Sequence, residues 1–304
     1  MIIIDKINHK NVIKIIIIVC ITILFGISVA TLSFRYCLRY LQEKSILSEK
    51  PSVIMVGKNG DYTSFSEALE YAVREGNIVL KLANETFDIT KEINIKTYGN
   101  GLSIGNGVHI IGEANTVIRC NYIGDDAKVQ RDFSIFNALP SDFIIENVRI
   151  EARNIRYCVH DDYGGTTLPY THKYINIQMF HDSSVAIWRT PQCIGGGFGI
   201  NGTIIVDGGI YESVASNHSL SGEIDSKYSQ DVSSIPISYH SNLSQIDANN
   251  TFVIKNVYCV GEDSVIYYAC GTNGTAIITG NSFGRNPVEY GYSGKSYIWN
   301  NEIR

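Results

Sequence analysis

The sequence contains no Cys-x-x-Cys pair, few prolines and no excess of positive charge. Its seven cysteines occur at irregular intervals, which excludes the paired ligand spacing of structural zinc sites. After residue 49 the chain has 19 basic against 27 acidic residues, so bulk electrostatics give it no affinity for nucleic acid. We therefore expect buried free thiols, with a disulfide left open, at Cys120, Cys158, Cys193, Cys259 and Cys270.

Only one apolar run is long enough to cross a membrane. Residues 15–32 carry no charge, and lysines precede them while arginines follow. We favour an uncleaved anchor, although Ser28-Val29-Ala30 also has the form of a signal-peptide cleavage site. The expected protein is a single-pass protein of the cell membrane with its C-terminal domain extracytoplasmic. Its expected segments are a cytoplasmic N-terminus (1–14), a transmembrane helix (15–34), a stalk (35–52) and one domain (53–304).

The domain begins with a single amphipathic helix between two short strands. Ser64, followed three residues later by Glu67, has the form of a capping box. Apolar residues then recur at helical spacing until Gly76, a residue that commonly ends helices. No convincing helix follows, so the rest of the domain is predicted to be β-structure.

A short pattern recurs through that β-region. Two or three strand-forming residues, an asparagine or glycine, and a second strand repeat at intervals of 29, 32, 48, 24 and 20 residues. The shared positions are Asn147, Asn176, Gly208, Asn256, Gly280 and Asn300. Asn and Gly tolerate the left-handed backbone of a tight bend, so the pattern favours stacked coils of a parallel β-helix. An antiparallel β-sandwich is the alternative, because several Asn-Gly pairs could form hairpin turns.

The beginning of the domain resembles a known superfamily. The segments VGKNGDYTSFSEALEYA, IVLKLANETFDI and GVHIIGEANTVIRC, within residues 53–120, resemble the start of the pectin-lyase-like β-helix proteins, which include pectate lyases and pectinesterases. The resemblance implies an all-β fold, a right-handed single-stranded parallel β-helix with an N-terminal capping helix. It also implies a polysaccharide as substrate or ligand.

The catalytic motifs of the characterised members are missing. The Gln-Asp-x-Leu and Leu-Gly-Arg-Pro-Trp motifs of pectinesterases are absent, and the polygalacturonase motifs are not matched in order. The stretch from Val159 to Asp162 resembles the Asp-Pro-His-Asp segment of alginate epimerases without its first two residues. No catalytic role is therefore carried over from a family member to this chain.

The candidate site is the stretch RYCVHDDYGG, from Arg156 to Gly165. If successive coils stack, the stretches 157–160, 193–197, 237–240 and 265–268 form one parallel sheet. Alternation then places His160 and His240 on its outer face, two strands and about 10 Å apart. The predicted catalytic residues are His160, Asp161, Asp162, His240 and Arg189. The predicted substrate-binding residues are Gly195, Gly196, Gly197, Tyr157, Tyr239 and Tyr268.

Each of these residues has an expected role. The three glycines would form the floor of a groove, Asp161 and Asp162 would border it and orient His160, and Arg189 would meet a carboxylate. His172 and His181 are expected at the surface. The polar, serine-rich segment 217–234 is predicted to be a loop that overhangs the groove.

With His160 or His240 as the base, these residues suit removal of a proton from the carbon beside a uronate carboxylate, as in a lyase or epimerase. Glycoside hydrolysis is disfavoured, because neighbouring residues of a strand point to opposite faces. The alternative is a non-catalytic protein of glycan binding or envelope and exopolysaccharide assembly. No metal site is predicted; Ca²⁺ on Asp161, Asp162 and Asp182 is the one cofactor left open.

Overall fold

The computed structural model describes the domain in segments separated by gaps. The described residues are 52–92, 100–124, 126–162, 167–182, 192–197, 199–214, 234–240, 249–261, 265–268, 273–289 and 294–304. The predicted anchor, Arg189 and Cys270 lie outside them, as do the predicted stalk except for Ser52 and the predicted loop 217–234 except for Ser234. Within the described residues, no helix is both long and apolar enough to span a membrane.

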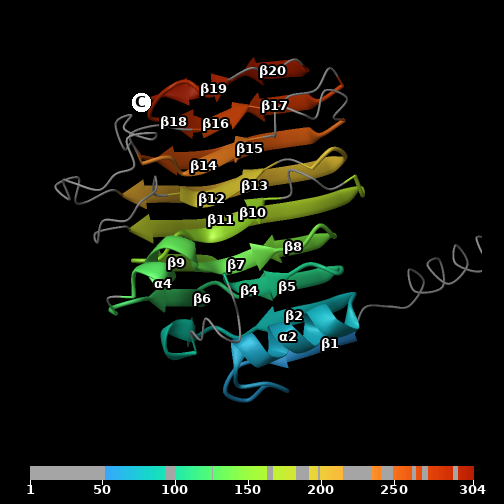
Figure 1. The fold of residues 1–304 in the computed structure, drawn as a ribbon, viewed down its shortest axis with the longest axis vertical. Helices are drawn as coiled ribbons and strands as arrows, with labels where there is room; N and C mark the ends of the chain where they lie inside the picture. Colours follow the sequence, from blue (N-terminus) through green and yellow to red (C-terminus); the bar gives the residue numbers. More distant parts are fainter. Residues whose placement is uncertain are drawn as a thin grey trace, which may run out of the picture. The chain divides into compact units, whose positions relative to one another are not determined.

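The predicted capping helix is present. Helix α2 (Phe65–Glu75) begins after Ser64, whose side chain accepts a hydrogen bond from the Glu67 amide, and it ends at Gly76. Its buried face packs against β2 (Ile78–Leu82) and β4 (Leu102–Ile104) at the start of the stack (Figure 1). Two short helical elements follow that the sequence did not predict, η1 (Ile89–Lys91) and α4 (Ala127–Asp132).

The strands form two parallel sheets that wind together as coils. Successive coils lie one above another from β1 (Ser52–Val56) to β20 (Lys295–Trp299), as Figure 1 shows. The seven-stranded sheet contains β4, β7 (Ser134–Ala138), β10 (Tyr157–Asp162), β12 (Gln192–Gly197), β14 (Ile237–His240), β16 (Val265–Tyr268) and β19 (Val288–Glu289). This order confirms that the four stretches around the candidate site share one sheet.

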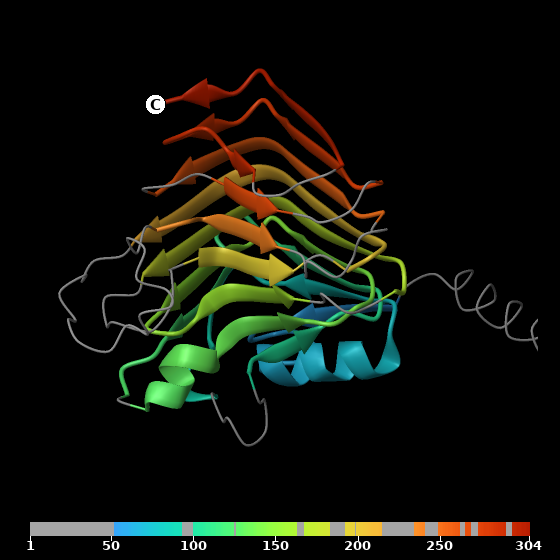
Figure 2. The ribbon, with the colours of Figure 1, turned by 45° about the horizontal axis from the view of Figure 1, so that its top comes forward.

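The fourteen-stranded sheet consists of two flat parts, called its two faces below, that meet at a bend. The bend is visible in Figure 2 where the long strands turn. Before the bend lie β1, β2, β5 (Val108–Gly112), β8 (Phe143–Glu146), β17 (Thr275–Thr279) and β20. After it lie β3 (Thr86–Asp88), β6 (Val117–Asn121), β9 (Arg149–Arg153), β18 (Ser282–Phe283) and β21 (Glu302–Ile303). The strands β11 (Tyr170–Asp182), β13 (Gly202–Val214) and β15 (Thr251–Val260) pass through the bend.

The bend is made by the repeated asparagines and glycines. All six predicted positions have positive φ, between 50° and 74°. The Asn176 side-chain amide also donates to the Asn147 amide oxygen of the preceding coil, 2.8 Å away. The prediction that these residues bend each coil through the left-handed backbone region is confirmed.

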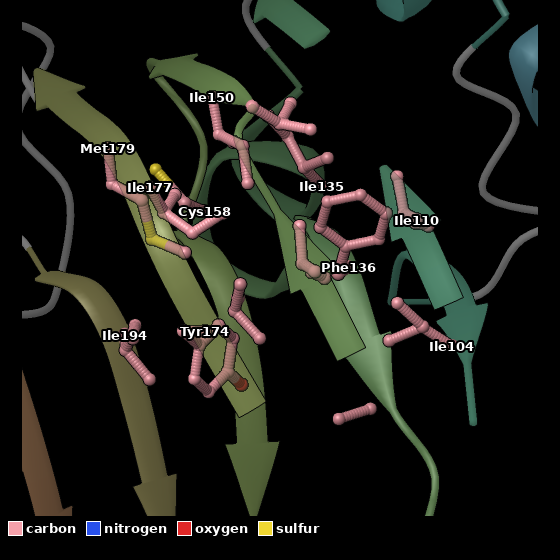
Figure 3. Close-up of a cluster of buried hydrophobic side chains, with 14 of the residues drawn as sticks. Ile104, Ile110, Ile135, Phe136, Ile150, Cys158, Tyr174, Ile177, Met179 and Ile194 are labelled. Carbon is pink, nitrogen blue, oxygen red and sulfur yellow. The ribbon is translucent and has the colours of Figure 1, made fainter. Parts of the chain in front are cut away.

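The core runs along the inside of the coils. One inner position is buried in each coil from Leu80 to Ile278: Leu80, Ile110, Ile145, Tyr174, Val206, Ile254 and Ile278. Figure 3 shows Ile110 and Tyr174 among the inward-facing side chains of this core. Four of the expected buried thiols, Cys120, Cys158, Cys193 and Cys259, lie in it as free cysteines. Burial of each large apolar side chain contributes about 1.5–3 kcal/mol, so this row of side chains holds adjacent coils together.

Candidate functional site

The candidate site lies on the outer face of the seven-stranded sheet, where β10, β12 and β14 are neighbours. Two rows of paired residues cross these strands, one from His160 through Gly195 to Ser238 and the other from Asp162 through Gly197 to His240. The two histidine positions are two strands apart, as predicted, but they belong to different rows. The structure describes the backbone of His240 but not its side chain.

His160 is half-buried and directed outward. Its Nδ1 lies 3.3 Å from the side-chain oxygen of Asn137, the residue paired with it on β7. An amide oxygen only accepts, so Nδ1 carries a proton, and the neutral imidazole then has its lone pair on Nε2. Asn137 is a contact that sequence reasoning missed, because only the register of the coils brings it beside His160.

Asp162 is the exposed carboxylate of this face. It lies two residues after His160 on β10, and side chains two apart on a strand point to the same side. An imidazole and a carboxylate therefore lie on the same side of one strand. In the next strand, the paired positions of both residues are glycines.

The first two glycines make room for tyrosine rings and do not form a bare floor. A Cβ at Gly195 would lie 2.7 Å from the Tyr157 ring, which covers this position from outside. A Cβ at Gly196 would lie 2.6 Å from the ring of Tyr239, which is fully buried. The predicted substrate-binding roles of Gly196 and Tyr239 are therefore wrong, since both belong to the interior.

Tyr157 is itself largely covered. It is 7% exposed, its ring centroid lies 6.0 Å from that of His160, and the guanidinium of Arg156 lies 4.7 Å from its centre. The aromatic ring thus packs near the His160 imidazole, three residues earlier on the same strand. The side chain of the remaining predicted tyrosine, Tyr268, is not among the described groups.

Asp161 is inside the β-helix, contrary to the prediction that it borders the groove. It is fully buried because it lies between His160 and Asp162, and alternation turns it inward. Its carboxylate accepts hydrogen bonds from Nδ1 of His172, at 2.9 Å, and from the hydroxyls of Tyr174 and Tyr239, at 2.8 and 2.7 Å. Asp161 therefore cannot orient His160 from the surface.

His172 forms a buried ion pair with Asp161. Its Nδ1 faces the carboxylate, and its Nε2 lies 3.1 Å from the carbonyl oxygens of both Leu139 and Ser141. These partners only accept, so both nitrogens are donors and the imidazole is a cation. Burial alone would raise the pKa of the Asp161 carboxyl, but the His172 charge and three hydrogen bonds hold that pKa below its ordinary value.

The predictions for two further histidines are wrong. His172 and His181 were expected at the surface and are 0% and 1% exposed. Both occur at alternating inner positions of β11, as the burial pattern of that strand shows. A polar residue at an inner position of an alternating strand was the signal in the sequence, but its partner on another coil was not visible there.

The described residues contain no group of three acidic, histidine or cysteine side chains placed to hold a metal ion. Asp161 and Asp162 point to opposite sides of β10, so they cannot both coordinate the same calcium ion. Asp161 is occupied by three hydrogen-bond donors instead.

Comparison with known proteins finds a similar solved structure. No protein-family model and no curated protein matches the sequence. A crystal structure of the pectin methylesterase from Aspergillus niger in deglycosylated form is similar at 16% identity and a TM-score of 0.34, over 84% of this chain and 86% of that one. The parallel pairing of the coils by itself identifies the domain as a parallel β-helix, the fold that the resemblance of residues 53–120 implied.

Proposed function

We propose that the outer face around His160 and Asp162 is a polysaccharide site, and that the protein is a lyase or epimerase for uronate-containing glycans. We also propose that the N-terminal segment anchors it in the cell membrane with this domain outside the cytoplasm. The observation that carries the enzymatic proposal is the hydrogen bond from His160 Nδ1 to Asn137, which leaves the lone pair on Nε2. A neutral imidazole in this tautomer is suited to act as a general base.

In the proposed reaction, Nε2 of His160 removes the proton on the carbon beside the uronate carboxylate. In a lyase the electron pair then forms a carbon–carbon double bond, the glycosidic carbon–oxygen bond breaks, and the leaving oxygen takes up a proton. In an epimerase a proton returns to the same carbon from the opposite face. Asp162 would contact sugar hydroxyl groups beside the base.

A non-catalytic glycan-binding protein is the second candidate. The observation that favours it is the burial of Asp161, because the outer face then retains only one of the two adjacent carboxylates. Such a protein would bind the same polysaccharide without changing it.

The experiment compares the full chain in mild detergent with its His160→Ala variant. Each is incubated with pectate, alginate and neutral polysaccharides, while ultraviolet absorbance, new reducing ends, proton exchange from solvent and binding are followed. His109→Ala is the matched control, because His109 pairs with Glu146 on the other sheet. The proposal predicts absorbance or proton exchange that the His160 variant loses at least about 100-fold and the control keeps.

Other outcomes separate the alternatives. Reducing ends without absorbance would indicate hydrolysis and contradict the proposal. Binding without any product would establish the non-catalytic candidate. Equal activity of the wild type and the His160 variant would remove His160 from the site.

A further inference from the structure

A polar hollow lies away from the seven-stranded sheet, at the bends of the large sheet. Its volume is about 420 Å³, within the range of roughly 300–1000 Å³ that is common for small-molecule sites. It is lined by Gly112, Glu113, Ala114, Asn115, Val117, Asn147, Val148, Arg149, Asn176 and Gln178. None of these residues belongs to the proposed active site.

The hollow exists because one bend is longer than the next two. Between β5 and β6 the chain passes through residues 113–116, whereas Asn176 lies within the continuous strand β11. Glu113, Ala114 and Asn115 are exposed and form a projecting wall. The following coils contribute the floor, where Gln178 and Arg149 are paired neighbours.

The wall is held in place by its own hydrogen bonds. The hydroxyl of the buried Thr116 donates to the carbonyl of Ala83, 2.9 Å away, and accepts from the amide of Glu113 at 2.8 Å. Gly112 brings the wall close to the next coil, since a Cβ there would lie 2.5 Å from the carbonyl oxygen of Asn147. The floor is equally constrained, because Asn147 and Asn176 are joined by their side chains. A preformed site loses little conformational entropy on binding.

The polar groups of the hollow suit hydroxyl groups better than they suit an ion. Amides of Asn115, Asn176 and Gln178 can each donate and accept, as a sugar hydroxyl does. Arg149 and Glu113 carry opposite charges, and the Arg149 Nε is already bonded to Glu151 at 2.7 Å. Ala114 and Val117, which are exposed and half-buried, add apolar surface for the carbon–hydrogen face of a sugar ring.

We propose that this hollow binds a neutral sugar unit, on a different face of the domain from His160. The inference does not rest on the proposed enzymatic function. A neutral side branch, or a neutral stretch of the same polysaccharide, could then be held while another part of the chain lies on the seven-stranded sheet.

The test uses the full chain in mild detergent and four probes, namely xylotriose, mannotriose, β-1,4-galactotriose and the acidic trigalacturonate. Binding is detected by saturation-transfer NMR, and dissociation constants are measured by titration. Asn115→Ala and Gln178→Ala remove exposed amides of the hollow. Asn84→Ala is the matched control, because Asn84 is an exposed asparagine at the corresponding bend one coil earlier.

We expect at least one neutral trisaccharide to bind, and each hollow variant to weaken it by about threefold to tenfold, the loss of one or two hydrogen bonds. Asn84→Ala and His160→Ala should leave this affinity unchanged, and circular dichroism should show that all variants are folded. The proposal is overturned if no neutral probe binds, if binding is insensitive to both hollow variants, or if only trigalacturonate responds to them. None of these results would alter the His160 assay, so the two proposals fail separately.

Discussion

Two buried histidines on one strand are held in different charge states by their hydrogen-bond partners. The His172 ring packs against the rings of Phe143 and Tyr170, with centroids 4.1 and 4.5 Å away, and it faces acceptors at both nitrogens, so it is cationic. His181 donates from Nε2 to the Ile155 carbonyl, 2.9 Å away, and burial lowers its pKa to about 4. The presence of the Asp161 carboxylate near His172 explains the difference.

Replacing Asp161 with asparagine should destabilise the domain by about 3–5 kcal/mol. The substitution leaves the His172 cation buried without its counter-charge, and an uncompensated buried charge is costly. The measurement is urea unfolding of the full chain at pH 7, with Asp162→Asn as the control. Asp162 is exposed, so we expect that control to change stability by less than about 1 kcal/mol. Equal effects of the two substitutions would show that the buried ion pair contributes nothing specific.

Because burial lowers the pKa of His181 to about 4, we expect the domain to lose stability as the pH falls from about 6.5 to about 4. In this window the unfolded chain protonates the imidazole at its ordinary pKa of 6.5, while the folded protein, with a pKa of about 4, does not. The unfolded state binds more protons, so the loss approaches roughly 3 kcal/mol. Asp161 acts at lower pH: its pKa lies below 3.8 when folded, so its contribution is present above that value and lost beneath it.

The measurement is the urea midpoint at pH 7.0, 5.5 and 4.5. His181→Gln should flatten the dependence, whereas His109→Gln, at a half-buried position on another sheet face, should keep it. A His181 variant with an unchanged pH dependence would refute the assignment.

At the scale of the structural element, the bend between the two faces of the large sheet is a single left-handed residue in most coils. Gly208 and Gly209 are adjacent at one such bend, with φ of 74° and 101°. They differ in the space around them. A Cβ at Gly208 would have its nearest neighbour 3.7 Å away, at Asn176, whereas a Cβ at Gly209 would lie within 1.9 Å of the Ile177 carbonyl oxygen.

We therefore expect Gly208→Asn to be neutral within about 1 kcal/mol, because asparagine tolerates this backbone and occupies the same position in neighbouring coils. Gly209→Ala should cost about 2 kcal/mol or more, because the adjacent backbone must move. Urea unfolding of the two variants measures the difference. Similar losses in both would mean that backbone strain alone, and not the close contact with Ile177, decides the tolerance.

At the scale of the whole domain, inward-facing residues stabilise the fold, and outward-facing residues form the candidate site. The inner positions form a continuous apolar row, interrupted by the ion pair of Asp161 and His172. In the described residues the row ends at Ile298, which pairs with Ile278 and is 44% exposed. Each coil is stabilised by its neighbours, as in other stacked architectures, so destabilisation in one coil should be felt mainly by the adjacent ones.

Local patterns in the sequence were sufficient for the capping helix, the six bends and the common sheet of four strands. The helix and the bends depend on residues close together in the chain: Ser64 caps its own helix, and Asn147 bends its own coil. The common sheet follows once such coils are stacked. The candidate site was only partly predictable. Alternation along the strand implies that Asp161 and Asp162 point to opposite sides of the sheet, as they do. Nothing near Asp161 in the sequence indicates that the Tyr239 hydroxyl donates to it from 78 residues away.

The sequence alone thus determined the capping helix and the bends, and favoured the β-helix over a β-sandwich, because helix caps, left-handed residues and apolar alternation act over a few neighbouring positions. Only the tertiary structure decided which polar residues are functional candidates. Stacking of the coils buried Asp161 and His172 as an ion pair and placed Asn137 beside His160. It also packed the rings of two tyrosines against the glycines of β12. These contacts depend on the register between coils, which is set by packing across long sequence separations.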